Sequence, residues 1–213
     1  YAKQKNVPAD KKGVFGYGDV WTWAAICADT KIVPCWLVAG RDAGAAHQFI
    51  SDLASRMANR IQLTSDGHRA YLEAVEDAFG MNVDYAMLVK MYGADPSGES
   101  SADRKYSPNE CVGIRTAPVT GNPDPKHIST SFAERLNLTL RMRMRRFTRL
   151  TNGFSKKVEN HMHAVAIHFF HYNFIRIHQT LKCTPAMRAG VTDRVWSIGD
   201  LIELLEISES QPN

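Results

Sequence analysis

The sequence predicts an α/β fold, in which a mixed sheet is flanked by helices and followed by a helical C-terminal part. Segments with strand character alternate with segments of helical periodicity through residues 19–93. Two neighbouring apolar runs near the start are nearly continuous rather than alternating, which is typical of strands covered on both faces. Beyond residue 130 helical periodicity dominates. Alternation of strands and helices favours a sheet that contains parallel pairs.

Size and composition allow a folded core. The chain has 213 residues, of which 44% are hydrophobic, and this fits one domain of ordinary size or slightly more. Lys plus Arg number 26 and Asp plus Glu 22, so the net charge of +4 is too small to indicate nucleic-acid binding by itself. Residues 135–157, however, contain eight basic residues and no acid. One element therefore carries a concentrated positive charge.

Cysteine usage and hydropathy exclude several classes of protein. Cys27, Cys35, Cys111 and Cys183 form no CxxC pair, so neither a zinc ribbon nor a disulfide framework is predicted, and we expect a reducing cytoplasm. No apolar run reaches the roughly 18 residues that a membrane span requires. The first residues have no signal-peptide apolar region. We therefore expect no membrane partner.

Residues 19–40 predict a β-hairpin whose strands meet at the turn-like "ADTK". Pro34 places the second strand at a sheet edge, where a missing N–H is tolerated. Three tryptophans of this segment are expected in the core: Trp21, Trp23 and Trp36.

The next segment alternates helices and strands. Residues 42–60 predict a helix, with Ala46, Phe49, Ile50, Leu53 and Met57 at helical spacing. Residues 60–79 predict a short buried strand, a turn at Asp66-Gly67 and a second helix, and another strand follows at residues 82–93. Residues 93–127, rich in Gly, Pro, Ser and Asp, predict a long irregular connection.

The remaining elements are predicted to be helical. Two long helices are expected at residues 131–149 and 155–176. In "TPAMRAG", Thr184 can cap a short helix, Pro185 stands at its first position and Gly190 ends it. A last helix is expected near residues 198–207. The predicted organisation is thus a polar lead (1–18), a core (19–180, with the irregular insertion 93–127) and a helical extension (181–213).

The arginine-rich segment at residues 131–149 allows two interpretations. Its Leu and Met residues alternate with polar ones, which is strand periodicity. At 100° per residue, however, one stripe gathers Phe132, Leu136, Leu140, Phe147 and Leu150, and the opposite one gathers Glu134, Asn137, Arg141, Arg145 and Arg149. Only a helix explains the whole length, and Leu, Met and Arg favour it.

Two acids stand out, and each has an ordinary structural interpretation. Glu134 lies in the first turn of the arginine-rich helix, where Ser131-x-x-Glu134 fits a capping box. Asp66 fits a turn residue or a cap before the next helix. Alternatively, Asp66 follows a strand at the end where open α/β sheets place their sites, and Glu134 could face the same rim.

Paired acids facing DNA require a cation. Two carboxylates at 4 Å repel by about 1 kcal/mol in water and about 4 kcal/mol at an effective dielectric of 20, and a phosphodiester adds to the repulsion. Mg²⁺ prefers oxygen ligands, commonly one or two carboxylates with water and substrate phosphate. Asp66 and Glu134 beside phosphate-binding arginines therefore predict a phosphoryl-transfer site that uses Mg²⁺ or Mn²⁺.

Three segments resemble a known family: "TSDGHRAYLEAVEDAFG", "GNPDPKHISTSFAERLNLTLRMRMRRFTRLTNGFSKKVENH" and "YNFIRIHQTLKCTPAM". They are similar to bacterial insertion-sequence transposases of the DDE type, closest to the insertion-sequence-one-like group. The resemblance covers residues 19–205. It implies a core with the ribonuclease H and integrase fold.

The resemblance also implies an activity: nicking at a transposon end, followed by attack of the freed 3′-hydroxyl on target DNA, with two metal ions held by Asp, Asp and Glu. Asp66 matches the second acid and Glu134 the third. The first acid lies in relatives on an opening strand that this chain would begin too late to contain, and Asp19 and Asp29 are poor substitutes.

The resemblance therefore implies an N-terminally truncated core. In relatives the opening strand lies mid-sheet, so its loss is expected to split the sheet. We expect the isolated chain to be poorly stable and inactive in DNA cleavage, and its full-length form to be a homo-oligomer. The family's N-terminal zinc-ribbon and helix-turn-helix region is likewise expected to be missing from this chain.

The remaining candidates are binding or supporting residues. DNA phosphates are the expected partners of Arg135, Asn137, Arg141, Arg145, Arg149, Lys156 and Lys157, with a solvated face as the alternative. Support of the Glu134 helix or contact with DNA is expected of Tyr172, Asn173, Arg176 and His178, and His68 is a further candidate for substrate contact or for a helix start. Five histidines at positions 161–178 lack a clean metal-ligand set, so surface or core positions are expected for them.

Two other functions compete with a transposase core. A ribonuclease H-like nuclease or resolvase would cut DNA without strand transfer. A non-catalytic DNA-binding remnant would use both acids only as caps.

Overall fold

A computed structural model describes residues 7–93, 111–148, 153, 155 and 157–210. The chain forms two compact units. One, Asp42–Ser131, is a single stretch and is called the continuous unit. The other joins Tyr1–Arg41 to Phe132–Asn213 and is called the discontinuous unit. The two units are defined by how compactly each is packed. The domain boundaries expected from the sequence, at residues 18 and 180, stay predictions.

The discontinuous unit begins with the predicted hairpin. β1 (Trp21–Ala24) pairs antiparallel with β2 (Trp36–Ala39). Beyond the strands, the Cys27 N–H donates to the Ile32 carbonyl at 2.9 Å, and Lys31 takes a φ of 61° where the chain reverses. The hairpin and its turn are confirmed. Pro34 precedes β2 rather than interrupting it, so it removes no donor from the two-stranded ladder.

The prediction that all three hairpin tryptophans lie in the core is wrong for one of them. Trp23 is buried and Trp36 is partly buried, but Trp21 is 46% exposed. The guanidinium of Arg41 lies 4.7 Å from the centre of the Trp21 ring. A cation over the face of an aromatic ring stabilises the ring at a solvent-facing position, which explains how Trp21 is accommodated outside the core.

The helices of the discontinuous unit are α3 (Ser131–Arg143), α4 (Val158–Phe170), α5 (Pro185–Arg188) and α6 (Ile198–Ser210). One predicted end is wrong. The arginine-rich helix stops at Arg143, and a 3-10 turn follows at Arg145–Phe147 beside the buried Met144. The second long helix ends next to the predicted Arg176, and its last part, His171–Ile175, is a π-helix.

Local signals predicted α5 and α6 well. The Thr184 hydroxyl accepts from the Met187 N–H at 3.2 Å, Pro185 is the first helical residue and Gly190 has a φ of 72°. These are the expected cap, start and end of α5. In α6 the predicted helix extends three residues further, to Ser210.

One apolar cluster holds the discontinuous unit together. Leu136 and Leu140 of α3 are buried, as the helical stripe predicted, and Phe169 of α4 stacks on Trp36 with 6.1 Å between ring centres. The cluster joins the hairpin to both long helices through Val33, Val38, Leu136, Leu140, Met144, Val158, Val165, Phe169 and Tyr172. Hydrophobic burial therefore fixes which face of α3 points inward.

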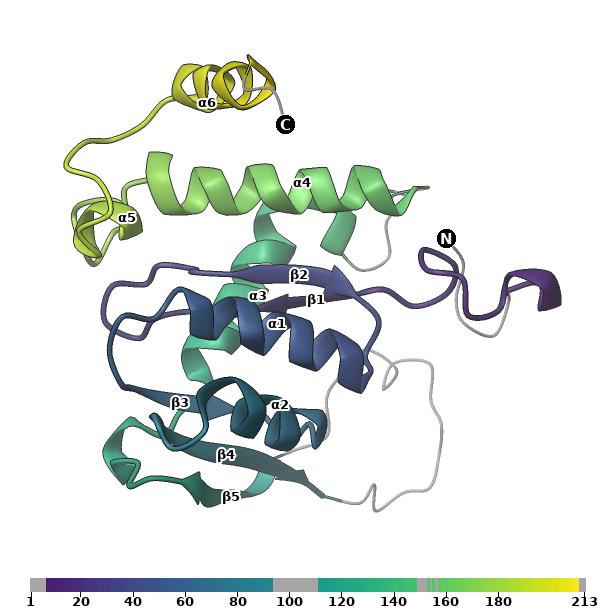
Figure 1. Cartoon of the computed structure of the whole chain (residues 1–213), viewed down its shortest axis with the longest axis vertical. Helices are drawn as coiled ribbons and strands as arrows, with labels where there is room; N and C mark the ends of the chain where they lie inside the picture. Colours follow the sequence, from purple (N-terminus) through teal and green to yellow (C-terminus); the bar gives the residue numbers. More distant parts are fainter. Residues whose placement is uncertain (1–6, 94–110, 149–152, 154, 156, 211–213) are drawn as a thin grey trace. The chain divides into compact units, whose positions relative to one another are not determined.

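The continuous unit has the predicted alternation of elements. Its order is α1 (Ala43–Ser55), β3 (Ile61–Ser65), α2 (Ala70–Phe79), β4 (Val83–Tyr92) and β5 (Cys111–Thr120). The carboxylate of Asp42 caps α1 by accepting from the Ala45 N–H at 2.9 Å. Figure 1 shows the three strands side by side with β4 in the middle, paired parallel with β3 and antiparallel with β5.

The prediction that residues 93–127 are irregular is wrong over β5. Gly113 and Pro118 made this segment look like a connection, but Pro118 pairs with Ala86 in an edge strand, where a residue without an N–H is tolerated. Residues 94–110, also within the expected irregular insertion, lie outside the described part of the chain.

The described strands form two separate sheets, one of two strands and one of three. The chain is thus a mixed α/β protein. The ribonuclease H-like arrangement, and the splitting of its sheet that the resemblance implies, stay predictions. Within the described residues, no helix is both long and apolar enough to cross a membrane.

Candidate functional site

Asp66 lies directly after β3, at the strand's carboxyl end, and is exposed. Its Oδ1 accepts from the backbone N–H of His68 at 3.1 Å, an Asx turn that reverses the chain before α2. This is the turn role that the sequence offered as the ordinary interpretation. The bond uses one oxygen, and the carboxylate's Oδ2 is not needed for it. Turn formation and metal binding are therefore compatible at Asp66.

The neighbours of Asp66 are well ordered by contacts with β4. The Ser65 hydroxyl donates to the Asp66 carbonyl at 2.9 Å and lies 2.7 Å from the hydroxyl of Tyr85. Tyr85 is buried, and burial raises the pKa of its phenol, with the Ser65 hydrogen bond opposing this and the Asp66 charge adding to it. A side chain at Gly67 would place Cβ 2.9 Å from a Val89 methyl. The loop thus passes close over β4.

His68 is placed as a residue at the helix start. Its ring meets Tyr71 edge to face, with 5.7 Å between the ring centres, and the His68 carbonyl accepts from the Tyr71 N–H at 3.1 Å. These contacts hold the turn into α2. They account for His68 without a substrate, and its expected contact with DNA stays a prediction.

Glu134 lies in the first turn of α3 and is exposed, as predicted. Asn137 and Arg141 share its outward side, opposite the buried Leu136 and Leu140. At the helix start the Ser131 N–H donates to the Ser129 hydroxyl at 3.2 Å, so Ser129 contributes to capping here. Ser131 itself is the first helical residue rather than the residue before it.

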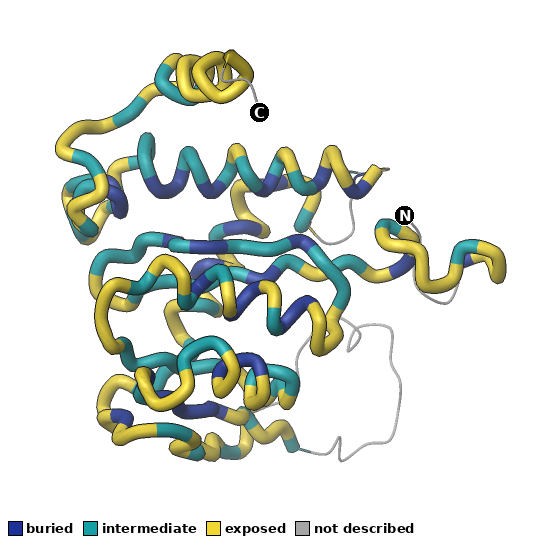
Figure 2. The backbone as a smooth tube through the Cα atoms, viewed as in Figure 1, coloured by how far each residue is buried: buried dark blue, intermediate teal, exposed yellow. Residues whose placement is uncertain are grey.

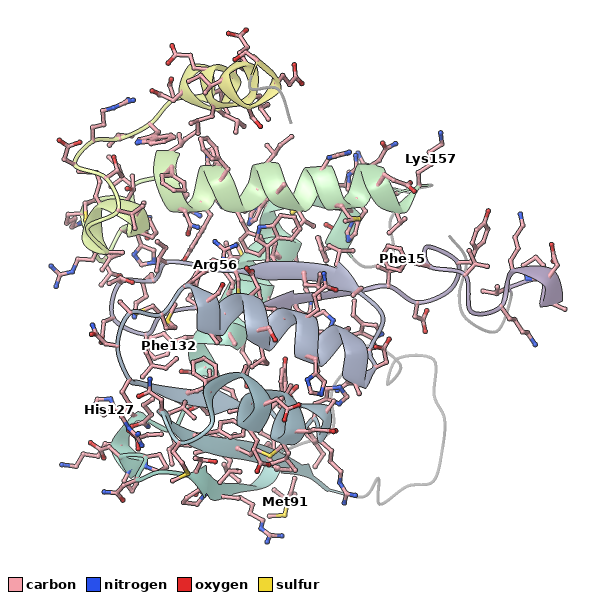
Figure 3. All side chains as sticks on the ribbon, viewed as in Figure 1. Phe15, Arg56, Met91, His127, Phe132 and Lys157 are labelled. Carbon is pink, nitrogen blue, oxygen red and sulfur yellow. The ribbon has the colours of Figure 1, made fainter. Side chains whose placement is uncertain are left out.

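Most predicted DNA-binding arginines are solvent-exposed. Arg135 and Arg141 lie on α3 and Arg145 in the following 3-10 turn. Lys157, exposed, precedes the first turn of α4 and is labelled in Figure 3. Arg149 and Lys156 lie outside the described residues.

Arg146, by contrast, is used inside the unit. Its guanidinium donates to the Ser155 hydroxyl and, at 3.3 Å, to the Asn160 carbonyl. It therefore ties the 3-10 turn to α4, a structural role that no sequence pattern around Arg146 indicates.

Two of the expected supporting residues have structural roles. Asn173 is buried in the π-helix, and its amide forms two hydrogen bonds with the backbone of Val33: Oδ1 accepts from the N–H at 3.0 Å, and Nδ2 donates to the carbonyl at 2.9 Å. Tyr172 is buried in the cluster that contains Leu136 and Leu140. Tyr172 therefore supports α3, whereas Asn173 holds the hairpin. The local π geometry is a feature often found at functional sites.

Arg176 and His178 lie where positive charges accumulate. Burial lowers the pKa of the Arg176 guanidinium, and the nearby charge of Arg143 lowers it further. Burial also lowers the pKa of His178, with smaller contributions from Lys31 and Arg176. Clustered cations of this kind favour an anion nearby. Both residues remain candidates for phosphate contact.

A different group of possible metal ligands was missed by the sequence analysis. Among the described residues, ligand atoms of His47, Glu73 and Asp77 lie within 4.8 Å of one another, on α1 and α2. The His47 Nδ1 lies 3.5 Å from the Asp77 carboxylate, an ion pair when the imidazole is protonated. The two acids are exposed, and a surface ion pair explains the arrangement without a metal. Three residues from two helices leave no spacing signal in a sequence.

The two predicted catalytic acids belong to different units. Asp66 is in the continuous unit and Glu134 in the discontinuous unit. Each carboxylate is exposed, and each follows or opens a regular element. Their meeting at one metal ion stays a prediction. Oxygen donors of this kind suit Mg²⁺ or Mn²⁺ better than zinc, which prefers nitrogen and sulfur ligands.

Comparisons with protein-family models, with curated proteins and with solved structures find no match to this chain.

Proposed function

We propose that this chain is the catalytic core of a DDE-type insertion-sequence transposase. The observation that carries the proposal is the placement of Glu134, an exposed carboxylate in the first turn of a helix whose other charged residues are all arginines. A surface that binds only polyanions gains nothing from an acid there. The acid is useful if a cation bridges it to phosphate.

In this proposal Asp66 and Glu134 hold the metal ion, and Arg135, Arg141 and Arg145 hold DNA phosphates. The bound Mg²⁺ or Mn²⁺ would supply Lewis-acid stabilisation of the phosphorane-like charge and a more acidic water. Water attacks the phosphodiester at a transposon end and the bond to the 3′-oxygen breaks, leaving a 3′-hydroxyl. That hydroxyl then attacks a target phosphodiester: a P–O bond forms to the transposon 3′-oxygen, the bond to the target's 3′-oxygen breaks, and the proton of the attacking hydroxyl ends on that leaving oxygen.

A first test asks whether both acids contact one metal ion. Fe²⁺ bound in place of Mg²⁺ generates hydroxyl radicals that cut the nearby backbone. In the presence of duplex DNA we expect cuts near both residue 66 and residue 134, and Mg²⁺ in excess should suppress both. Asp66→Asn keeps an oxygen for the His68 N–H and Glu134→Gln keeps the side-chain shape, yet each should abolish cutting at both places.

The same test distinguishes the proposed metal site from a non-catalytic DNA-binding remnant, in which both acids are only caps. Cuts at only one of the two positions, or cuts that survive Glu134→Gln, would show that the acids do not share a cation and would refute the metal site.

A second test concerns the arginines. Arg141→Gln should flatten the dependence of log K on log salt by about 0.9 for duplex DNA, because one phosphate contact is lost. Arg188→Gln is a matched control, since Arg188 is also exposed but lies on α5. Equal slopes for the two variants would show that α3 carries no phosphate contact at Arg141.

A strand-transfer assay separates a transposase from a nuclease on the same fold. A 3′-hydroxyl oligonucleotide and a plasmid target should yield joined products with a transposase, whereas a nuclease would only cut. Because the resemblance assigns only two of the three acids to residues of this chain, the metal-contact and salt-slope assays are the decisive ones for the 213 residues themselves.

A further inference from the structure

The helix α6 presents apolar side chains to solvent along its length. It contains no buried residue, and Figure 2 shows it exposed almost throughout. Ile198, Ile202 and Leu205 are all exposed, and together with the partly buried Leu201 their spacing places them on one side of the helix. Helices of globular proteins bury such a stripe. The stripe on α6 therefore lacks the cover that its pattern requires.

The segment that leads into α6 is firmly anchored, so the exposure is not that of a loose end. The Trp196 ring lies 5.0 Å from the Phe174 ring and 6.0 Å from the Phe170 ring, centre to centre. Asp200 accepts from the Ser197 N–H at 2.6 Å and pairs with Arg194. The helix start is thus capped and fixed, while the stripe that follows faces water.

The charge on α6 limits what can cover it. The helix carries Asp200, Glu203, Glu206 and Glu209 and no basic residue. An anionic membrane surface would repel it, since interfacial helices are usually rich in Lys and Arg. A second α6 would bring two sets of acids together. The stripe is therefore suited to an apolar surface bordered by positive charge.

The outer face of α3 has this character. Leu138 and Met142 are 42% and 76% exposed and lie one helical turn apart. Arg141 lies on one side of this pair and Arg135 on the other, and the charged residues of α3 are three arginines and Glu134. Contact with phosphates alone gives no reason for two large apolar side chains in the middle of an arginine surface. A protein partner that carries an apolar stripe bordered by acids would contact both the apolar pair and the arginines.

We propose that α6 of one copy docks on the outer face of α3 of a second copy. Both surfaces are exposed within a single copy, so neither covers the other there. In a two-fold dimer the contact occurs twice, because each chain offers both an α6 and an α3. The docked acids cover the arginines of α3, and the contact competes with DNA for them. This competition rests on the proposed function, whereas the dimer contact does not.

The first experiment measures the oligomeric state by sedimentation over a concentration series. The full chain should be a dimer that weakens as salt rises. Ile202→Glu should weaken dimerisation at least about tenfold, the loss expected for one central apolar contact. Ile207→Glu is the matched control, since Ile207 is 55% exposed against 51% for Ile202 but lies on the opposite side of α6. Circular dichroism confirms that each variant is folded.

A change on α3 identifies the docking surface. Met142→Glu should also weaken the dimer, whereas a contact between two α6 helices would be unaffected by it. Mixing Met142→Glu with Ile202→Glu should restore a heterodimer, because the first variant keeps an intact α6 and the second an intact α3. A chain that is monomeric at every concentration, or variants at 202 and 207 with equal effects, would overturn the proposal.

The second experiment measures DNA binding. At a protein concentration where the full chain is dimeric, Ile202→Glu should bind a short duplex several-fold more tightly than the unaltered chain, and Ile207→Glu should not. A dimer that binds DNA as tightly as the Ile202→Glu variant would overturn the competition. If no variant binds DNA, the proposed function fails, while the sedimentation results still decide whether α6 docks on α3.

Discussion

Replacing Asn173 by aspartate tests how the π-helix holds the hairpin. The Asn173 amide accepts from the N–H of Val33 and donates to its carbonyl, and both bonds are buried. A carboxylate can still accept the first bond but cannot donate the second. At neutral pH the Asn173→Asp variant therefore leaves the Val33 carbonyl facing a buried negative charge.

The expected cost is large and depends on pH. Leaving a buried carbonyl unsatisfied costs about 1–3 kcal/mol, and burying the charge adds to it, so we expect a loss of about 3–5 kcal/mol in unfolding free energy at pH 7. Protonation restores a donor. Burial beside a carbonyl raises the pKa of the new carboxyl above its ordinary value of about 3.9. The loss relative to the unaltered chain is therefore smallest near pH 4 and grows as pH rises through the raised pKa.

Tryptophan fluorescence during urea unfolding measures this loss, because all four tryptophans belong to the discontinuous unit. Each variant is compared with the unaltered chain at the same pH, so that other titrating groups cancel. Asn173→Ala is the control: it removes both bonds and should cost about 3 kcal/mol at every pH. A cost for the aspartate variant that does not change with pH, or an alanine variant as stable as the original, would refute the reasoning. Hydrogen exchange of the Val33 amide provides a second measurement, since the bond to that amide survives only in the aspartate variant.

Two further predictions concern stability. Burial lowers the pKa of His168 to about 4 from 6.5, with the charges of His171, Arg143 and Arg176 adding to the effect. The unfolded chain therefore binds the proton more tightly than the folded chain does. The contribution of the neutral His168 to the unfolding free energy should be fully present above pH 6.5. It should be lost, by about 1–2 kcal/mol after allowance for the ring's partial exposure, as the pH falls towards 4. His168→Phe should remove this part of the pH dependence in fluorescence-monitored unfolding, and an unchanged profile would show that another group titrates. Gly121 has a φ of 70°, and an added Cβ would lie 2.7 Å from the Val83 carbonyl oxygen, so Gly121→Ala should cost about 2–4 kcal/mol. Gly190→Ala, at a φ of 72° with no atom within 4 Å of the added Cβ, should cost only about 1 kcal/mol of unfolding free energy. Hydrogen exchange measured within each unit compares the two costs, and equal costs would contradict the prediction.

Local signals in the sequence predicted the elements that depend on local physics. The cap of α5 and the inward positions of Leu136 and Leu140 follow from neighbouring residues alone, and both are confirmed, whereas Phe132 of the same predicted stripe is exposed. β5 was missed because its formation depends on pairing with β4, and Gly113 and Pro118 hide that pairing in any local window.

The candidate site could be predicted only in part for a related reason. The exposure of Asp66 and Glu134 follows from their positions after a strand and in a first helical turn. The two hydrogen bonds of Asn173 could not be anticipated, because their partner is 140 positions away in the chain.

The division of the chain into units has a consequence for how the protein is made. Residues 42–131 leave the ribosome as one uninterrupted stretch and contain every described strand of their own sheet, so this part can fold cotranslationally. The hairpin at residues 21–39 emerges earlier but must wait for α3, α4 and Asn173 before its apolar side is covered. Closing so long a loop is entropically costly and slow. During synthesis, the apolar side of the hairpin therefore stays uncovered until the residues through Asn173 have been made.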